Sequence, residues 1–348
     1  MTTASIPVDD RARKPQNPVL RWLRTRSAWI LLLNALLVVV FGLLSRNNVF
    51  WSPANFESML LSVSQVLLLA LGLAMMLGAG VFDLSLGANL VLSSVVGAMV
   101  VRTFQTPEGY HDVGLAILLG LLACLGTGLL FGFVNGMLIA VAGINSLIAT
   151  LATLGIGTGI ALLVTGGADL GGLPADLQIA IGLNSIGIVP IPAILALGVG
   201  ALLWVVVRYT RYGLRTQAIG SSRLAAERAG VRVRTHLLSL AMLGGLLAGL
   251  AGFFDLARFG ATALNGHAND ALGAVTAAVI GGTLLEGGKI SITGAAWGAG
   301  LAVILQVGLV ILGVSAFWQL IVVGVVLLAA VLLDRVAALR RSRSPKPE

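Results

Sequence analysis

Long runs of apolar residues recur along the chain after residue 27. Several of them approach the ~20 residues that an α-helix needs to cross the hydrocarbon core of a bilayer. The runs are continuously apolar rather than alternating, which favours spanning helices over the strands of a β-barrel. Only 10% of the 348 residues are charged, whereas a soluble domain has about 25%. The sequence therefore predicts an all-α, polytopic integral membrane protein.

We expect three parts: a polar, basic tail over 1–27, a transmembrane domain over 28–334 and a second basic tail over 335–348. About ten spans fit the transmembrane domain, although length alone does not separate a short span from a re-entrant segment. The predicted spans are 28–45, 57–79, 85–102, 114–140, 144–166, 190–208, 236–257, 271–284, 293–312 and 315–334.

The Lys and Arg residues are concentrated in three places. Six lie in the first tail, seven in the segment 208–236 and five in the last tail, out of 22 in the chain. Short basic segments next to spans stay on the cytoplasmic side of a membrane. We therefore place both termini and the loop 208–236 in the cytoplasm, and the net charge of +8 reflects topology rather than a nucleic-acid partner.

The loop 208–236 contains a compact helical pattern at Leu224-Ala225-Ala226-Glu227-Arg228-Ala229-Gly230. Gly230 is suited to a left-handed residue that ends the helix. The small alanines leave a low surface that fits a groove on another protein. This pattern predicts a docking helix, and the alternative is an ordinary amphipathic connector between two spans.

Asp83 stands between two apolar runs, close to Ser85. An ionisable group beside the hydrocarbon marks a pathway or cavity, but an acid there can also cap the following helix. Both interpretations stay open. Polar residues at span positions suit a neutral, hydrogen-bonding solute, although each one can also bond across helices. They are Asn34, Gln65, Asn89, Asn135, Asn145, Thr150, Thr153 and Gln306, and we take Asp83, Ser85, Asn135, Thr150, Thr153 and Gln306 as pathway candidates.

Enzymatic chemistry is not expected. The chain has no G-x-x-x-x-G-K-[ST] phosphate loop, so it is not expected to bind ATP in that manner. Its three histidines show no metal-ligand spacing, His111 and His236 stand isolated, and Cys124 is interpreted as a packing residue. The segments 80–87 and 281–288 resemble each other at an offset of 201, which leaves an internal repeat open.

Several motifs in a shared order make the chain similar to the permease subunits of bacterial ABC importers of the ribose/xylose/galactose class, related more distantly to branched-chain amino-acid permeases. The resemblance covers nearly everything after residue 57. The motifs that carry it are Asp83-Leu-Ser-Leu-Gly87, Val134-Asn-Gly136, Ile148-Ala-Thr-Leu-Ala-Thr153, Thr210-Arg-Tyr-Gly213, Ala225-Ala226 with Gly230, Val279-Ile-Gly-Gly282 and Leu332-Leu-Asp334.

The resemblance implies a permease in the bacterial inner membrane that imports a monosaccharide or polyol. It implies a cytoplasmic ABC ATPase, a periplasmic or lipid-anchored solute-binding protein and a second permease copy, identical or not. The coupling residues would be Leu224, Ala225, Ala226, Glu227 and Gly230. Leu224 replaces a usual acid, and Ala271-Leu-Gly273 replaces a usual acidic pair. The alternatives are another small solute, such as an amino acid or nucleoside, or a secondary transporter without an ATPase.

Overall fold

The computed structural model describes residues 26–265, 267, 270–315 and isolated positions between 317 and 332. The tail 335–348, all but two residues of the tail 1–27 and much of the predicted span 315–334 therefore lie outside the described residues. What remains includes nine of the ten predicted spans.

Helices occupy each of these nine positions, with ends within several residues of those predicted. They are α2 (Arg26–Leu44), α3 (Pro53–Gly78), α4 (Leu86–Arg102), α5 (Val113–Gly136), α6 (Ser146–Thr165), α8 (Ile191–Tyr209), α11 (Val233–Phe259), α12 (Asp270–Ile280) and α13 (Ile292–Ile311). Six are long and apolar enough to cross a membrane: α3, α5 with its extension to Val141, α6, α8, α11 and α13. The multi-pass, helical character is confirmed.

The helix at the predicted span 271–284 is short. α12 has 11 residues, which gives a length of about 16 Å against a hydrocarbon core of about 30 Å. It ends because the chain turns at Gly282, whose φ of 95° is left-handed. The remaining residues of the predicted span form turns rather than helix, so α12 does not cross the bilayer by itself.

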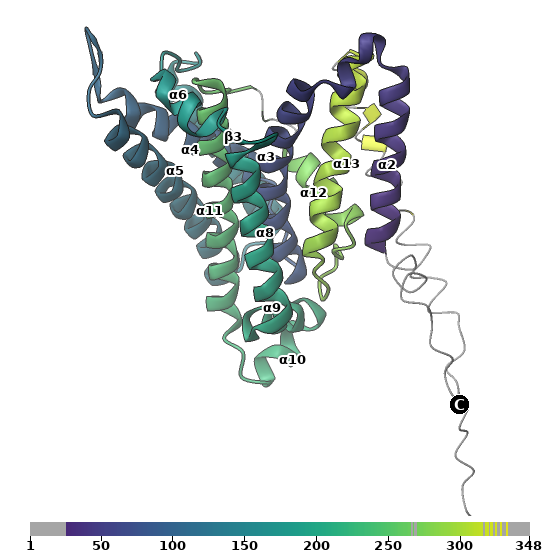
Figure 1. Cartoon of the computed structure of the whole chain (residues 1–348). Coiled ribbons are helices and arrows are strands. Elements are labelled where there is room, and N and C mark those ends of the chain that lie inside the picture. The colour runs from purple at the N-terminus through teal and green to yellow at the C-terminus, as the bar shows by residue number, and fades with distance from the viewer. Residues whose placement is uncertain are drawn as a thin grey trace, which may run out of the picture.

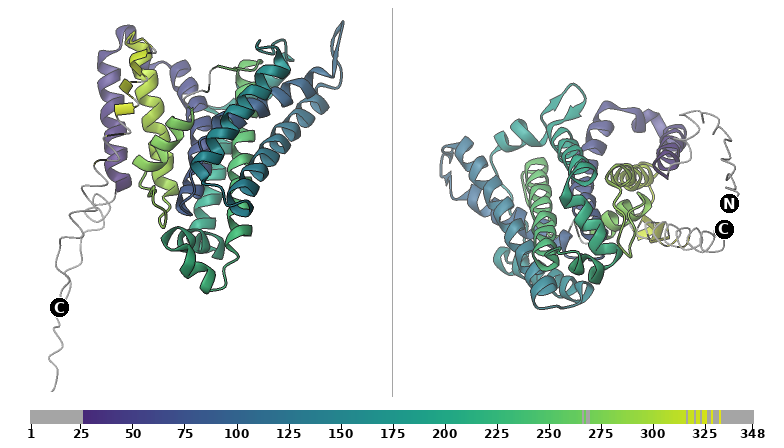
Figure 2. Two further views of the ribbon diagram at one scale, coloured as in Figure 1. Left: turned by 180° about the vertical axis from the view of Figure 1, so that it is seen from behind. Right: turned by 90° about the horizontal axis from the view of Figure 1, so that it is seen from below.

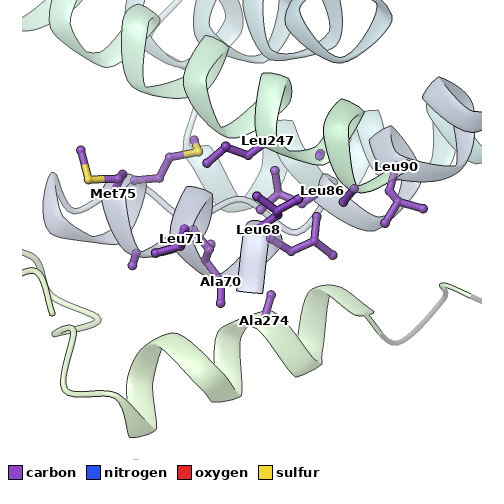
Figure 3. Close-up of a cluster of buried hydrophobic side chains, with 14 of the residues drawn as sticks. Leu68, Ala70, Leu71, Met75, Leu86, Leu90, Leu247 and Ala274 are labelled. Atoms are coloured by element: carbon purple, nitrogen blue, oxygen red, sulfur yellow. The ribbon is translucent and has the colours of Figure 1, made fainter. Parts of the chain in front are cut away.

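α3 and α11 form the centre of the bundle. α11 packs against α3, α4 and α5, and α3 also contacts α12 and α13. α3 therefore connects the helices α4, α5 and α11 to the group formed by α2, α12 and α13, as Figure 1 and the view from below in Figure 2 show. The apolar core around Leu68, Leu71 and Met75 of α3 includes Leu247 of α11 and Ala274 of α12 (Figure 3).

Glycines bring α5 and α11 into close contact. A Cβ added at Gly128 would lie 2.4 Å from the carbonyl oxygen of Gly245, and one added at Gly245 would lie 2.2 Å from that of Gly128. Small residues at these positions let two backbones approach, which replaces the hydrophobic driving force that lipid does not supply. Gly128 and Gly245 thus serve helix packing.

Two short helices project from one end of the bundle, beyond the ends of α8 and α11 (Figure 1). They are α9 (Arg211–Ser221) and α10 (Arg223–Arg228). The remaining short elements are the 3-10 helix Arg46–Trp51, the hairpin of β1 (Gln105–Thr106) with β2 (Gly109–Tyr110), the π-helical segments Met137–Val141 and Gln178–Gly182, α7 (Ala175–Leu177), and the hairpin of β3 (Ser185–Ile186) with β4 (Val189–Pro190). The β1–β2 hairpin lies at the end of the bundle opposite to α9 and α10 (Figure 1).

Candidate functional site

The predicted docking helix is α10, and its ends are set by local hydrogen bonds. The Oγ of Ser222 accepts a hydrogen bond from the amide of Ala225 at the first turn. At the other end, the amide of Gly230 donates to the carbonyl of Glu227 and the amide of Val231 to that of Ala226, both at 3.0 Å. These two bonds form a Schellman motif. Gly230 has a φ of 81°, so the helix ends as the sequence predicts.

The faces of α10 differ in exposure. Ala226 is buried against the core, whereas Leu224, Ala225 and Glu227 are exposed. Glu227 forms an ion pair with Arg223 at 3.4 Å, one helical turn apart. An exposed pair of this kind contributes little stability. The outward face of α10 is therefore small and partly apolar, with Leu224 58% exposed.

α9 is tied to α11 by polar contacts around His236. The Nε2 of His236 lies 2.8 Å from the Oγ1 of Thr216, and its ring packs on that of Tyr212 at 4.5 Å between centroids. The hydroxyl of Tyr212 lies 3.0 Å from the Oγ of Ser239. Burial raises the pKa of this tyrosine. His236, which the sequence left isolated, thus connects the loop helices to a spanning helix.

Three chain segments contact one another through backbone atoms near the end of α9, and each contributes a glycine to the contact. The amide of Gly288 donates to the carbonyl of Gly78 at 3.0 Å. A Cβ added at Gly220 would lie 2.1 Å from the oxygen of Gly78 and 2.4 Å from the nitrogen of Gly288. We call Gly78, Gly220 and Gly288 the glycine junction. It joins α9 to the end of α3 and to the turn between α12 and α13.

Asp83, Ser85 and Asn135 form one buried hydrogen-bonded cluster at the start of α4. The Oδ1 of Asp83 accepts from the amide of Ser85 at 2.8 Å and from its hydroxyl at 2.5 Å. The Nδ2 of Asn135 donates to the Oγ of Ser85 at 2.7 Å. The Oδ1 of Asn135 is buried and has no hydrogen-bond partner among the described residues. Asp83 therefore turns the chain into α4, and one acceptor in the cluster is left free.

The other three pathway candidates are not part of this cluster. Thr150 and Thr153 lie on α6, where their hydroxyls donate to carbonyls of their own helix, that of Ser146 in the case of Thr150. Gln306 is exposed on α13. One link to α6 exists, because the amide of Phe82 donates to the Oγ of Ser146 at 3.1 Å. The structure thus brings together three of the six candidates.

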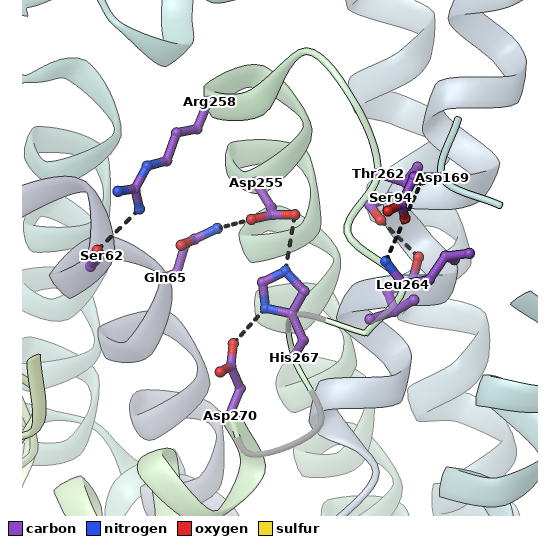
Figure 4. Close-up of polar contacts among 11 residues, drawn as sticks. Ser62, Gln65, Ser94, Asp169, Asp255, Arg258, Thr262, Leu264, His267 and Asp270 are labelled. Carbon is purple, nitrogen blue, oxygen red and sulfur yellow. Dashed lines mark hydrogen bonds and ion pairs between the residues drawn. The ribbon is translucent and has the colours of Figure 1, made fainter. Parts of the chain in front are cut away.

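A second buried polar group is one that the sequence analysis missed (Figure 4). The Nε2 of His267 lies 3.0 Å from the Oδ2 of Asp255, and its Nδ1 lies 2.7 Å from the Oδ2 of Asp270. The Nε2 of Gln65 donates to the Oδ1 of Asp255 at 2.7 Å. We call Gln65, Asp255, His267 and Asp270 the histidine cluster. It joins α3, α11, the following connection and the first residue of α12.

The sequence signal for this cluster was Asp255, because it is the only acidic residue in the predicted span 236–257. Its complete burial requires compensation, since an unpaired charge in the interior is costly. Desolvation by burial opposes the charged form of His267, but its interactions with Asp255 and Asp270 outweigh this effect and raise its pKa to about 10. The imidazole is therefore cationic at neutral pH and balances the buried carboxylate.

The connections around the end of α11 are also tied to each other. The Oδ1 of Asp169 accepts from the amide of Leu264 at 2.8 Å (Figure 4). The amide of Leu170 donates to the Oγ1 of Thr262 at 2.8 Å. Arg258 donates to the hydroxyls of Ser58 and Ser62 on α3, each at 3.0 Å. These contacts hold the segment 169–170 and the connection after α11 in one arrangement.

Comparison with known proteins gives matches along most of the chain. Residues 55–331 match the model of a family described as branched-chain amino acid transport system / permease component. The ribose import permease protein of Bacillus subtilis is 36% identical over 302 residues, which is 86% of this chain and 90% of that protein. No solved structure gives a significant match.

Two further relatives are transport proteins of similar length. The D-allose transport system permease protein of Escherichia coli is 31% identical over 333 residues, covering 96% of this chain and 98% of that protein. The galactose/methyl galactoside import permease protein of Salmonella typhimurium is 28% identical over 333 residues, covering 92% and 97%. The named relatives thus share their length and their sugar-related names.

Proposed function

The chain belongs to the branched-chain amino acid transport system / permease component family, and we propose that it is the permease subunit of an ABC importer for a monosaccharide or related polyol. The observation that carries this proposal is 36% identity to a ribose import permease over 86% of this chain and 90% of that one. The relatives named for allose and galactose support the same class of solute. In this role the chain transports and does not catalyse.

ATP hydrolysis in this proposal belongs to a separate cytoplasmic ATPase, because the sequence has no phosphate loop of its own. α10 docks on that ATPase through its exposed face, which includes Leu224, Ala225 and Glu227. Leu224 gives this contact an apolar side chain where the resemblance described above implies an acid. Ala226 and Gly230 hold the helix in shape rather than contacting the partner.

Movement of α10 reaches the spans through α9. The contacts of Thr216 and Tyr212 with α11 form one route, and the glycine junction forms the second. Both routes involve short distances between packed elements, so a displacement of α9 is not absorbed by flexible side chains. We infer that these contacts couple the ATPase to α3, α11 and α13.

The solute pathway in this proposal passes the cluster of Asp83, Ser85 and Asn135. Its support is the free Oδ1 of Asn135, a buried acceptor that a sugar hydroxyl can satisfy. Thr150 and Thr153 lie on the neighbouring helix α6, and Gln306 contributes from α13 only if α13 faces the pathway in the assembly. The neutral character of most of these groups suits a polyhydroxylated solute.

The assembly would include a second permease copy, identical or a sister chain, and a periplasmic or lipid-anchored solute-binding protein. Large apolar side chains exposed on α5 and α6, such as Leu118, Leu130 and Ile156, provide surface for lipid or for that second copy. The bacterial inner membrane is the expected location. The orientation follows the basic loop, so α9 and α10 face the cytoplasm.

The test is to purify the tagged chain from native membranes and identify the proteins that copurify. We expect an ABC ATPase and, after reconstitution with the cognate binding protein, sugar uptake that requires ATP. Uptake by the chain alone under an ion gradient, with no ATPase present, would contradict the proposal. Uptake of an amino acid or nucleoside instead of a sugar would agree with an ATPase-driven importer but would contradict the proposed class of solute.

A further inference from the structure

A pocket of about 550 Å³ lies where α8 passes into α9, against the start of α13. It is distinct from the cluster around Asp83 and from the exposed face of α10, none of whose residues line it. Its walls come from three elements, so it is a feature of the packed bundle rather than of one loop. The lining residues are Trp204, Val207, Arg208, Tyr209, Thr210, Arg211, Leu214, Gln217, Ile290, Ser291, Ile292 and Thr293.

The polar wall of the pocket is cationic. Arg208 and Arg211 contribute two guanidinium groups, and none of the twelve lining residues is acidic. Within the part of the chain that the structure describes, neither arginine has a carboxylate within ion-pair distance. A guanidinium presents several N–H donors in a planar fork that matches the oxygens of a phosphate. Two such groups without an internal partner indicate an anionic ligand.

The lining of the pocket also has an apolar and aromatic part. Trp204 and Tyr209 contact each other edge to face, with centroids 5.7 Å apart and an angle of 82°. Both side chains are exposed, as are Leu202 and Val205 on the same helix. Trp and Tyr gather where a spanning helix leaves the hydrocarbon. The pocket therefore combines guanidinium groups with aromatic side chains that lie on the same helix as the exposed apolar residues Leu202 and Val205.

We propose that this pocket binds the phosphate of an anionic phospholipid from the cytoplasmic leaflet. Arg208 and Arg211 hold the phosphate oxygens, while the acyl chains lie along Trp204 and the exposed apolar residues of α8. Basic pockets between helices on the cytoplasmic side are suited to lipid head groups. A free phosphate would use the guanidinium groups but would leave the aromatic wall without a function, so the two-sided chemistry favours the lipid.

Binding there has a consequence for α9. Arg211 is the first residue of α9, and Leu214 and Gln217 of the same helix line the pocket. A bound head group would thus contact α8, α9 and the start of α13 together. The lipid would hold α9 at the membrane surface, next to the glycine junction, and stabilise the arrangement from which the loop helices move.

The test uses the purified full-length protein, delipidated in detergent and titrated with phosphatidylglycerol or phosphatidylcholine, with bound lipid counted by native mass spectrometry. We expect specific binding of phosphatidylglycerol. Arg208→Gln and Arg211→Gln should each weaken it by about tenfold, since a lost hydrogen bond to a charged group costs about 1.5 kcal/mol or more. Arg234→Gln is the control, because Arg234 is exposed on the same loop but does not line the pocket.

Three results would overturn the proposal. Equal binding of the two lipids would remove the role of the anionic head group. An equal loss in Arg234→Gln would assign the effect to the overall charge of the loop. Displacement of phosphatidylglycerol by inorganic phosphate at similar concentration would show a phosphate site that does not recognise lipid. Size-exclusion chromatography and circular dichroism verify that each variant is folded, which exposed arginines should permit.

Discussion

His267 and Asp255 form an ion pair between the connection after α11 and α11 itself, with Nε2 3.0 Å from Oδ2. The two atoms are close enough for an ion pair, but they are not aligned as a hydrogen bond, and neither has another hydrogen-bond partner in the described part of the chain. Asp270 holds the other ring nitrogen, and the carbonyl of His267 lies against Gly87 at the start of α4. The side chain of His267 thereby ties α11 to α12, and its backbone carbonyl adds a contact with the α4 region that also contains Asp83.

This ion pair predicts a stability that depends on pH. The pKa of His267 is raised to about 10 in the folded protein, above the value of 6.5 of a free imidazole. A raised pKa means that the folded state binds the proton more tightly, so the stabilisation is complete below about pH 6.5 and is lost as the pH rises through about 10. Asp255 and Asp270 are the acids that face the ring, and Arg258 lies on the same helix as Asp255.

The measurement is thermal unfolding in detergent between pH 6 and pH 10.5, for the natural chain and for His267→Gln. Glutamine keeps polar atoms without a charge, so we expect it to unfold at lower temperature at pH 6. The difference between the two proteins should shrink as the pH rises. A difference that stays constant over this range would show that the charge of His267 does not stabilise the fold.

We expect Gly230 to be required because of its left-handed backbone conformation, and not because a side chain at this position would lack space. A Cβ added there meets no atom within 4 Å, whereas its φ is 81°. A β-branched residue is strained in this region, by about 1 to 2 kcal/mol. We expect Gly230→Val to unravel the end of α10 and to abolish solute-stimulated ATP hydrolysis in the assembled complex, while membrane insertion is retained.

Gly230→Asn is the matched control, because asparagine enters the left-handed region more easily and occupies the same open space. It should keep most of the stimulated ATP hydrolysis. If the valine and asparagine variants lose activity equally, the surface at this position matters rather than the turn. If the valine variant hydrolyses ATP normally, α10 is not the coupling element.

Asp83 should act through hydrogen bonding at the start of α4. Its Oδ1 accepts from both the amide and the hydroxyl of Ser85. Asparagine keeps that oxygen, so we expect Asp83→Asn to transport solute normally. Asp83→Ala removes the acceptor and should lower the free energy of unfolding by about 1 kcal/mol, as for a lost cap. Thermal unfolding and uptake assays measure the two effects, and loss of uptake in the folded asparagine variant would assign the carboxylate to the pathway.

Local features of this chain could be predicted from the sequence, and contacts between distant segments could not. α10 and its end at Gly230 depend on nine residues in a row, from Ser222 to Gly230, and each step has a known residue preference. The contact of Gln65 with Asp255 joins residues 190 positions apart. No periodicity relates such positions, so the buried carboxylate of Asp255 was visible in the sequence and its partners were not.

α12 and the resembling segments show a second limit. Apolar composition continues past Ile280, so hydropathy extends the span to residue 284, but backbone geometry ends the helix at a left-handed glycine. α3 ends in the same way, with Gly80 at a φ of 73°. The two helix ends are equivalent when Gly80 is paired with Gly282, an offset of 202, whereas the sequence comparison paired Gly80 with Gly281. The positions of glycines in the sequence are therefore not sufficient to align the two resembling segments.

The glycine junction gives the sharpest test of how α9 connects to the spans. At Gly220 a Cβ would lie 2.1 Å from the oxygen of Gly78 and 2.4 Å from the nitrogen of Gly288, and both are backbone atoms that no rotamer change can move. Gly220→Ala must therefore separate the segments, at a cost of about 1 to 3 kcal/mol for overpacking. We expect lower thermal stability and a clear loss of solute-stimulated ATP hydrolysis. Gly126→Ala is the control, because a Cβ at Gly126 on α5 meets no atom within 4 Å. A Gly220→Ala variant that matches this control in both measurements would show that the junction neither packs as tightly as described nor transmits movement.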